Sequence, residues 1–201
     1  SLTTNILGEK LPSLFIKASG FNLAEMEPAG HPALDLEFLQ KLRVLEDLSD
    51  ERMMQELCTH LLDSRSPTPS IETLVHAFIP GKFVDHTHAD AILSLGNTQR
   101  PEQVLKEVFG NTVVAVPYRR PGFLLSKEVA QTSLKNPRVK GLILSNHGLL
   151  TWGSNAQASY ETHIELVSQA EDFIRQRSGD RIMFGGVRQA ALEPEERQRV
   201  A

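Results

Sequence analysis

The sequence predicts an α/β fold, arranged as a three-layer α/β/α sandwich with a central, mostly antiparallel sheet. Two observations point to this class. Strand-like and helix-like segments alternate irregularly along the 201 residues, and the strand-like segments at 139–148 and 149–153 follow each other closely enough to pair as a hairpin. The chain is 40% apolar and 23% charged, which is typical of one globular domain with a substantial core.

The first half of the chain is expected to contain one early strand followed by helices. LPSLFIKASG, at 11–20, predicts a short strand that runs into a Ser-Gly turn. Apolar residues at helical spacing, each run preceded by a residue whose side chain can cap a helix, predict three helices. These helices are 32–48, 50–63 and 71–79, with Asp35, Ser49 and Ser70 as the candidate caps.

The second half contains the strand-like segments with the strongest apolar character. Residues 82–95 begin as a strand and are expected to turn helical. VKGLILSNHG, at 139–148, predicts a buried strand that ends in a polar turn, and LLTWG continues it as a hairpin. The remaining expected elements are a helix over 101–110, a strand over 112–118, a helix over 126–136 with Ser126 as its cap, and a long helix over 155–176.

Composition excludes several classes of function. The net charge of −4 gives no electrostatic basis for binding nucleic acid or an anionic membrane, and no apolar stretch is long enough to span a bilayer. The single cysteine, Cys58, cannot form an intramolecular disulfide and falls in a helical pattern, where a small core residue is expected. With no signal peptide in evidence, we expect a cytoplasmic protein.

Two histidines stand in the middle of a strand-like segment, FVDHTHADAI at 83–92. Because alternate residues of a strand share a face, His86 and His88 would point the same way and could bind one metal ion. His147 stands at the end of the apolar segment GLILSN, at a position where a buried residue would be expected to be apolar. Three imidazoles that leave one position open are the ligand set of a catalytic zinc-type site. The alternative is that these histidines are ordinary half-buried or exposed residues.

Other polar residues allow both a structural and a functional interpretation. Glu72 and His76 lie one helical turn apart, so Glu72 is either an acid at the start of a helix or a general acid/base. Ser70 at a helix start, and Ser19 with Gly20 in KASG, either cap and turn the chain or present N–H groups to an anion such as phosphate.

Six motifs in the same order resemble the class II aldolase/adducin family, in particular its fuculose- and rhamnulose-phosphate aldolases. Within that family the sequence most resembles the aldolase half of bifunctional rhamnulose-1-phosphate aldolase/alcohol dehydrogenase proteins. The resemblance extends over about residues 13–175. The motifs are KASG at 17–20, PS-I-E at 69–72, HTHAD at 86–90, PYRRPG at 117–122, SNHGLLTWG at 145–153 and the long helix from Asn155.

The resemblance implies a fold, a reaction and a set of site residues. It implies a lyase that cleaves a ketose 1-phosphate or a related sugar phosphate through a metal-stabilised enediolate, assembled as a homo-oligomer, with a tetramer favoured. Glu72 would be the catalytic acid/base. The metal, Zn²⁺ or another divalent cation, would be bound by His86, His88 and His147, and the substrate phosphate by Ser19, Gly20 and Ser70.

The sequence also departs from the family pattern. The Gly-Gly-Asn-Ser/Thr segment, whose Asn and Ser/Thr help to bind phosphate and enediolate in the family, is expected to be missing, because the chain begins Ser1-Leu2-Thr3. Ile71 stands where relatives often have a second Ser or Thr. We therefore expect an aldolase/adducin-like domain over 1–180 without this segment, and a tail over 181–201. The alternatives are a truncated and catalytically impaired or adducin-like non-catalytic domain, or a sugar-phosphate dehydratase or epimerase on the same metal site.

Overall fold

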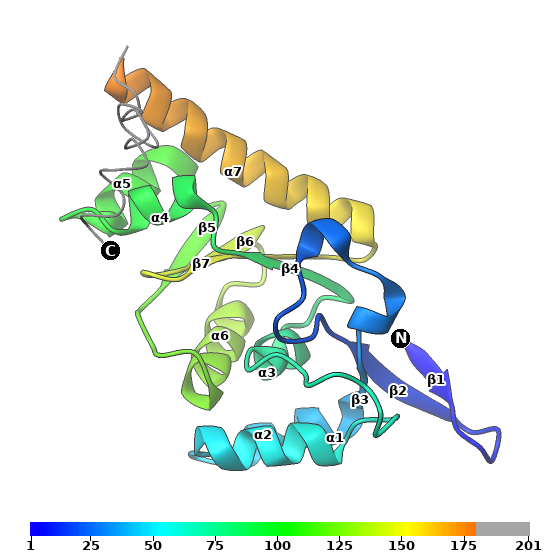
Figure 1. The fold of residues 1–201 in the computed structure, drawn as a ribbon. Coiled ribbons are helices and arrows are strands. Elements are labelled where there is room, and N and C mark those ends of the chain that lie inside the picture. The colour runs from blue at the N-terminus through cyan, green and yellow to red at the C-terminus, as the bar shows by residue number, and fades with distance from the viewer. Residues whose placement is uncertain (180–201) are drawn as a thin grey trace, which may run out of the picture.

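The computed structural model describes residues 1–179, which form a mixed α/β fold (Figure 1). Its larger sheet has the strand order β4-β7-β6-β5, in which β5 and β6 are parallel and the other neighbours are antiparallel. This confirms the predicted α/β class with a mostly antiparallel sheet. The predicted tail at 181–201 lies outside the described residues. The strands are β4 (Phe83–Thr87), β5 (Val113–Val116), β6 (Gly141–Leu144) and β7 (Gly148–Gly153).

Helices cover both faces of this sheet and give the three predicted layers (Figure 1). Strand β6 is buried along its whole length, as its apolar sequence GLIL requires. Its side chains alternate between two cores: Ile143 packs with one group of helices, whereas Leu142 and Leu144 pack with the other. The first group is α4 (Asp90–Gly96), α5 (Pro101–Phe109) and α7 (Ala156–Ser178), and the second is α3 (Thr73–Phe78) and α6 (Phe123–Lys135).

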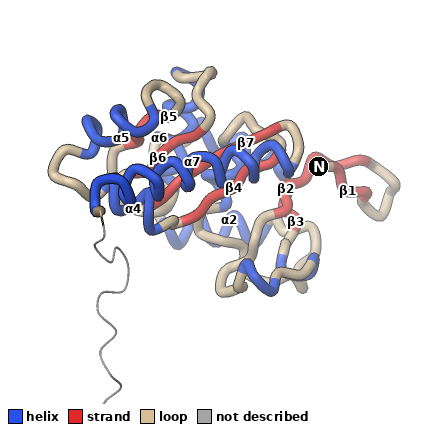
Figure 2. Tube along the Cα trace, turned by 90° about the horizontal axis from the view of Figure 1, so that it is seen from above, coloured by secondary structure: helices blue, strands red, loops and turns tan. Residues whose placement is uncertain are grey.

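A smaller antiparallel sheet, with the order β1-β2-β3, lies next to the larger one. Only its middle strand is expected from the sequence, because the outer two are each three residues long and too short to show alternation. The β1–β2 hairpin projects from one end of the molecule (Figure 2). The strands are β1 (Leu2–Thr4), β2 (Lys10–Phe15) and β3 (Ala33–Asp35).

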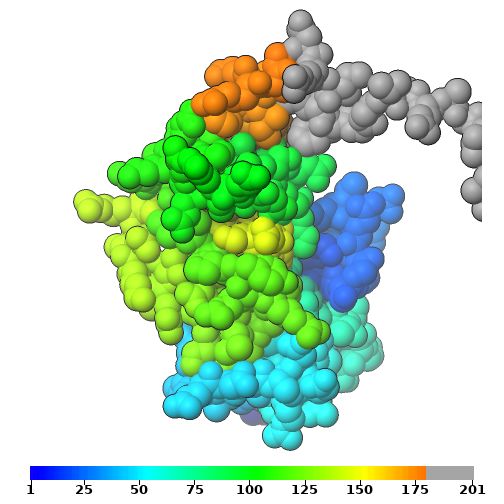
Figure 3. Space-filling view, turned by 90° about the vertical axis from the view of Figure 1, so that its left-hand side faces the viewer, coloured from blue at the N-terminus to red at the C-terminus, as the bar shows by residue number. Residues whose placement is uncertain are grey.

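A third core cluster joins this smaller sheet to the helical layer formed by α1 (Leu36–Lys41) and α2 (Asp50–Thr59). Leu34 of β3, Met53 of α2 and Phe78 of α3 are members of it, so the cluster also reaches the layer beneath the larger sheet. The α1–α2 layer lies at one end of the molecule and the C-terminal end of α7 at the other (Figure 3). No helix within residues 1–179 is long and apolar enough to cross a membrane.

Two of the predicted helix caps are confirmed. The side chain of Asp35 accepts a hydrogen bond from the backbone N–H of Phe38, and that of Ser49 accepts one from Arg52. The predicted helix over 32–48 is shorter than expected, because β3 occupies its start and a 3₁₀ turn follows α1. Cys58 was predicted to be a core residue but is exposed, since it lies on the outer face of α2.

The other two predicted caps are wrong. Helix α3 begins at Thr73 with Glu72 at its N-cap, and the Ser70 hydroxyl instead accepts from the Glu72 N–H in the turn before the helix. Helix α6 begins at Phe123, so Ser126 lies inside it and donates to the carbonyl of Gly122. In both cases the serine bonds to the local backbone as capping residues do, but at a different position.

Candidate metal centre

Strand β4 carries the H-x-H motif at the edge of the larger sheet. It pairs with β7 so that His86 lies opposite Leu150 and Thr87 lies opposite Leu149. Val84 packs in the same core cluster as Leu150, on the face covered by α3 and α6. By alternation His86 lies on that face too. His88 follows one residue after the strand ends.

His147 lies in the tight turn between β6 and β7. Its N–H donates to the carbonyl of Leu144 at 3.0 Å, and Asn146 before it has a φ of 55°, in the left-handed region that asparagine tolerates better than most residues. A Cβ on Gly148 would lie 2.3 Å from the carbonyl oxygen of Thr87 and 3.1 Å from the His88 ring. Glycine at this position therefore allows the His147 turn to approach the H-x-H segment.

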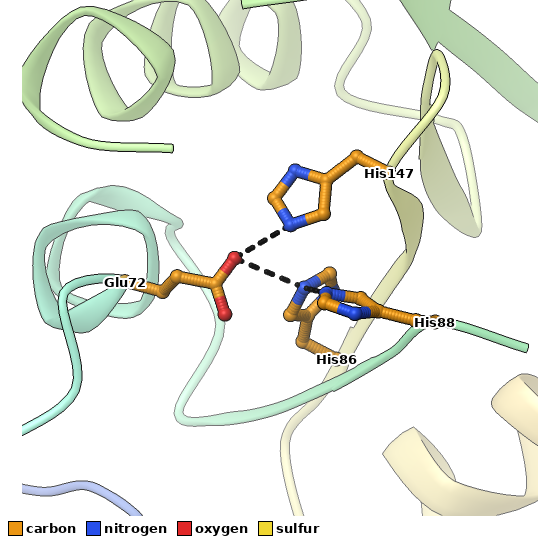
Figure 4. A group of neighbouring side chains, drawn as sticks. All are labelled: Glu72, His86, His88 and His147. Atoms are coloured by element: carbon orange, nitrogen blue, oxygen red, sulfur yellow. Dashed lines mark hydrogen bonds and ion pairs between the residues drawn. The ribbon is translucent and has the colours of Figure 1, made fainter. Parts of the chain in front are cut away.

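Glu72 comes from a different layer. It occupies the N-cap position of α3, in a turn that the Ser70 hydroxyl stabilises by accepting its N–H. Its side chain extends towards the three imidazoles, which enter from the strand segment and from the β6–β7 turn (Figure 4). Helix α3 packs against α6, and this packing fixes the distance from Glu72 to the sheet.

The ligand-type atoms of these four residues converge on one point. Glu72 Oε1 lies 2.7 Å from Nε2 of His147 and 3.2 Å from Nε2 of His86. The Nε2 atoms of His86 and His88 are 3.1 Å apart, and all four ligand atoms lie within 4.8 Å of one another. Ligands about 2.0–2.1 Å from a tetrahedral Zn²⁺ are about 3.3 Å apart, so these separations are close to those of a coordination shell.

The orientation of His86 fits a ligand role. Its Nδ1 lies 2.9 Å from the carbonyl oxygen of Leu149. A carbonyl only accepts, so Nδ1 carries the proton and Nε2 presents its lone pair to the centre. The side chains of His147 and Glu72 approach the same point as His86 Nε2, and they are 6% and 17% exposed.

Buried polar atoms at the centre lack hydrogen-bond partners within residues 1–179. They are Oε1 of Glu72 and both ring nitrogens of His147; the 2.7 Å contact between these residues has the distance of an ion pair but not the geometry of a hydrogen bond. Unpaired buried polar atoms are costly, and a cation bound among them would remove that cost. Three imidazole nitrogens and one carboxylate oxygen are a donor set that suits Zn²⁺ and related divalent ions. The residues therefore fit such an ion.

Two of the four residues at the centre, Glu72 and His88, have lowered pKa values. Burial opposes ionisation of Glu72, but the contacts with His147 and His86 outweigh it and hold the pKa of this carboxyl well below its usual range. Burial, followed by the neighbouring His86 and His147, lowers the pKa of His88. At neutral pH the carboxylate is ionised and the His88 ring is neutral.

A cavity of about 500 Å³ opens beside this centre. Glu72 and His86 form part of its wall, and the rest comes from the segment after β2, the turn before α3, strand β4 and the start of α7. Ser70 also lines this cavity. Among the other polar residues that line the cavity, the sequence singled out His76 but not Lys17, His31 or Tyr160. No spacing rule connects the segments that carry these residues.

Ser19 and Gly20 are exposed and are not among the residues that line this cavity. They lie close to Ser70 nevertheless, because Ser19 donates its N–H to the carbonyl of Thr68 at 3.0 Å and Ala18 forms a β-bridge with Pro69. The structure thus brings the KASG turn beside the loop that precedes Ser70 and leaves Ser19 and Gly20 exposed.

The fold and the site together define a class of protein, α/β domains with a candidate single-metal centre where an edge strand and a hairpin turn meet a helix N-terminus. Residues 5–174 match the family Class II Aldolase and Adducin N-terminal domain. The chain therefore belongs to the class II aldolase and adducin family, as its motifs indicated.

Similarity to individual proteins agrees with this membership. The N-terminal class II aldolase domain of a conserved protein from Thermoplasma acidophilum is 38% identical, with a TM-score of 0.82 over 87% of this chain and 81% of that one. L-fuculose 1-phosphate aldolase has the same fold at 14% identity, with a TM-score of 0.56 over 94% of this chain and 81% of that chain.

A longer relative carries a different name. "Uncharacterized oxidoreductase YuxG" of Bacillus subtilis is 37% identical over 96% of this chain, but the chain spans only 28% of that protein's length. The similarity therefore covers one part of a larger polypeptide.

Proposed function

We propose that the chain is the catalytic domain of a metal-dependent class II aldolase that cleaves a ketose 1-phosphate or a related sugar phosphate. The observation that supports it best is the convergence of one carboxylate and three imidazoles on a single point beside a cavity of about 500 Å³. Membership of the class II aldolase family supports the reaction type. The name oxidoreductase belongs to the whole of a relative of which this chain matches 28%, and the proposal concerns the matched part.

The three imidazoles of His86, His88 and His147 would hold the cation, Zn²⁺ or another divalent ion. When bound, the cation would supply Lewis-acid stabilisation of the negative charge that develops on the substrate oxygens as the carbon–carbon bond breaks. The chain itself contributes the movement of the proton. In cleavage, the Glu72 carboxylate would take up the proton of the hydroxyl whose carbon becomes the aldehyde and deliver a proton to the carbon that loses the bond. In the direction of synthesis the same transfers run in reverse.

The position of Glu72 suits this role, because it belongs both to the imidazole cluster and to the cavity wall. The lowered pKa of its carboxyl means that Glu72 is ionised at neutral pH, which is the form that can take up a proton. A lysine Schiff base is not needed in this scheme.

For the phosphate we propose Ser70, Ser19 and Gly20, through hydroxyl and backbone N–H groups. The support is that Ser70 lines the cavity and that the KASG turn is hydrogen-bonded to the loop before it. Lys17 lines the same cavity and adds a positive charge. An anionic group of the substrate would therefore be attracted to this end.

We also propose that the protein is a homo-oligomer, with a tetramer favoured. Side chains with large apolar surfaces stay exposed at the cavity's edge, among them Phe15, Leu23, Tyr160 and Ile164, each at least 45% exposed. A neighbouring subunit could cover such a group. Sedimentation of the purified protein at several concentrations tests this, and a monomer at all of them would contradict it.

Two measurements on the purified chain test the function. Elemental analysis is expected to find about one divalent ion per chain, or uptake of one on titration. A retro-aldol screen over ketose 1-phosphates with metal present is expected to yield a three-carbon keto phosphate from at least one substrate. A chain that takes up no divalent ion would refute the proposal. Metal binding without any turnover, even with the Gly-Gly-Asn-Ser/Thr segment added, would favour the catalytically impaired alternative.

A further inference from the structure

A histidine on α7 lies directly behind the strand that carries the H-x-H motif. His163 is only 4% exposed and lies on the buried face of α7, with Leu166 one turn further along. Its ring contacts side chains of two neighbouring strands, Thr87 of β4 and Thr151 of β7. These threonines are on the sheet face opposite to the imidazole cluster, because they alternate with His86 and Leu150.

The hydrogen bonds around His163 have one consistent direction. The Thr151 hydroxyl donates to the carbonyl of Ser159 at 3.2 Å, so at 2.9 Å it accepts from Nδ1–H of His163. Nε2 then has no proton and accepts from the Thr87 hydroxyl at 2.7 Å. One neutral ring therefore fixes the side chain of Thr87 and ties it to the first turns of α7.

The surroundings of His163 keep the ring in this neutral form. Burial lowers its pKa, which the nearby Asp85 opposes and His86 supports. A protonated ring could not accept from Thr87, so the neutral form is the one that completes the chain of hydrogen bonds.

Thr87 lies in the chain between the two imidazoles of the H-x-H motif. It is the last residue of β4, which within residues 1–179 is an edge strand that pairs only with β7. His88 lies beyond the end of the strand and is exposed, so no ladder hydrogen bond holds it. Strand ends at a sheet edge open more easily than central strands. The contact between His163 and Thr87 is thus a side-chain restraint on the residue that lies between His86 and His88 in the chain.

We propose that His163 is a positioning residue for the metal centre, which holds Thr87 on one face of the sheet and thereby directs His86 and His88 to the other. The inference rests on the proposed metal-binding function. It concerns residues that are not among the proposed ligands; Thr87 and His163 also line part of the cavity beside the centre, so the test measures metal binding and not turnover. Mutation of residues that orient metal ligands in this indirect way commonly lowers metal affinity about 10- to 100-fold.

The test compares metal binding by two variants with binding by a control. His163→Phe keeps a ring of similar shape but removes both hydrogen bonds, and Thr87→Val removes only the hydroxyl. Leu166→Ala, on the same face of α7, leaves a cavity in the core without touching Thr87. For each protein we would measure the dissociation constant for Co²⁺, the visible absorption spectrum of the Co²⁺ form and the thermal midpoint of the metal-free form.

His163→Phe and Thr87→Val are each expected to weaken Co²⁺ binding about 10- to 100-fold and to shift the Co²⁺ absorption bands. The double variant should be no weaker than the weaker single, because both changes break one interaction. Leu166→Ala should lower the thermal midpoint at least as much but leave affinity and spectrum unchanged. His163→Gln, whose amide oxygen can accept from Thr87, should regain part of the affinity.

Two results would overturn the inference while leaving the metal site intact: wild-type affinity and spectrum in His163→Phe, or an equal loss of affinity in Leu166→Ala, which would mean that general destabilisation is responsible. If the unaltered protein binds no divalent ion, the proposed function falls and this inference falls with it. The two failures are therefore distinguishable by the behaviour of the unaltered protein.

Discussion

Glu72 and His147 meet at 2.7 Å although they belong to a helix N-terminus and a hairpin turn that are far apart in the chain. Their contact joins the two halves of the centre, the carboxylate from the layer below the larger sheet and the imidazoles from the sheet itself. Because Glu72 and the three histidines come from different layers, the proposed acid/base and the proposed metal ligands can be tested separately.

Glu72→Gln is expected to reduce retro-aldol turnover by about 10²- to 10⁴-fold, because the amide keeps the shape but cannot take up the proton. Metal content should stay near one ion per chain, since three imidazoles remain. The measurement is kcat together with elemental analysis of the same sample. Turnover that survives in the variant would exclude Glu72 as the acid/base.

Gly148→Ala is expected to disturb the centre without altering any ligand. The added Cβ would meet the Thr87 carbonyl at 2.3 Å and the His88 ring at 3.1 Å, so the turn and the H-x-H segment must move apart. We expect weaker metal binding, by at least about tenfold, because ligand geometry is lost. Gly96→Ala is the matched control, since nothing lies within 4 Å of its Cβ. Equal affinities in the two variants would contradict the close approach.

His88→Ala should remove the most exposed of the three imidazoles. Only two protein nitrogens would remain, and the ion should be lost on dialysis. Stabilisation by a bound ligand is about 2.7 kcal/mol at a hundredfold excess over the dissociation constant. The rise in thermal midpoint on adding Zn²⁺ should therefore be clear for the unaltered protein and absent for the variant. An unchanged rise would show that His88 is not a ligand.

His76 predicts a pH dependence of stability. Burial, supported by His86 and opposed by Glu72, lowers its pKa from 6.5 to about 4. Between these values the unfolded chain binds the proton and the folded one does not, so stability is complete above about pH 6.5 and decreases as the pH falls towards 4. The loss is at most about 3 kcal/mol from this residue.

The measurement for His76 is the free energy of unfolding in urea, with EDTA present, at about pH 7 and about pH 4.5. His76→Gln should make the difference between the two smaller. It should not abolish it, because the pKa values of His88 and His163 are lowered as well. A variant with the full pH dependence of the unaltered protein would contradict the assignment to His76.

Local sequence patterns predicted much of the fold because the responsible interactions are local. The GLIL run of β6, and the caps at Asp35 and Ser49, need only neighbours in the chain to be recognised. The starts of α3 and α6 were misplaced, because a serine near a helix start can bond to the backbone in more than one register, and tertiary packing decides which.

The site was only partly predictable, because its residues come from segments that are far apart in the chain. His86, His88 and His147 stand out as polar residues in strand-like segments, and the structure brings them together with Glu72. His163 left a weaker signal, a single histidine on the helix face of Ser159, Leu166 and Ala170, all buried. Its partners come from two strands far away in the sequence, so no spacing rule could identify Thr87 and Thr151.

His147 lies in the β6–β7 turn, late in the chain, so the cluster of four residues can be completed only after this turn has formed. A polypeptide that ends before residue 147 has the H-x-H pair and the carboxylate, but it lacks both the ligand that closes the set and the β7 strand against which β4 is ordered. A complete, high-affinity site thus cannot form until most of the domain has folded. If the chain binds an ion as proposed, its capture is expected to be a late event, and the rate of capture in a stopped-flow experiment would report the completion of folding.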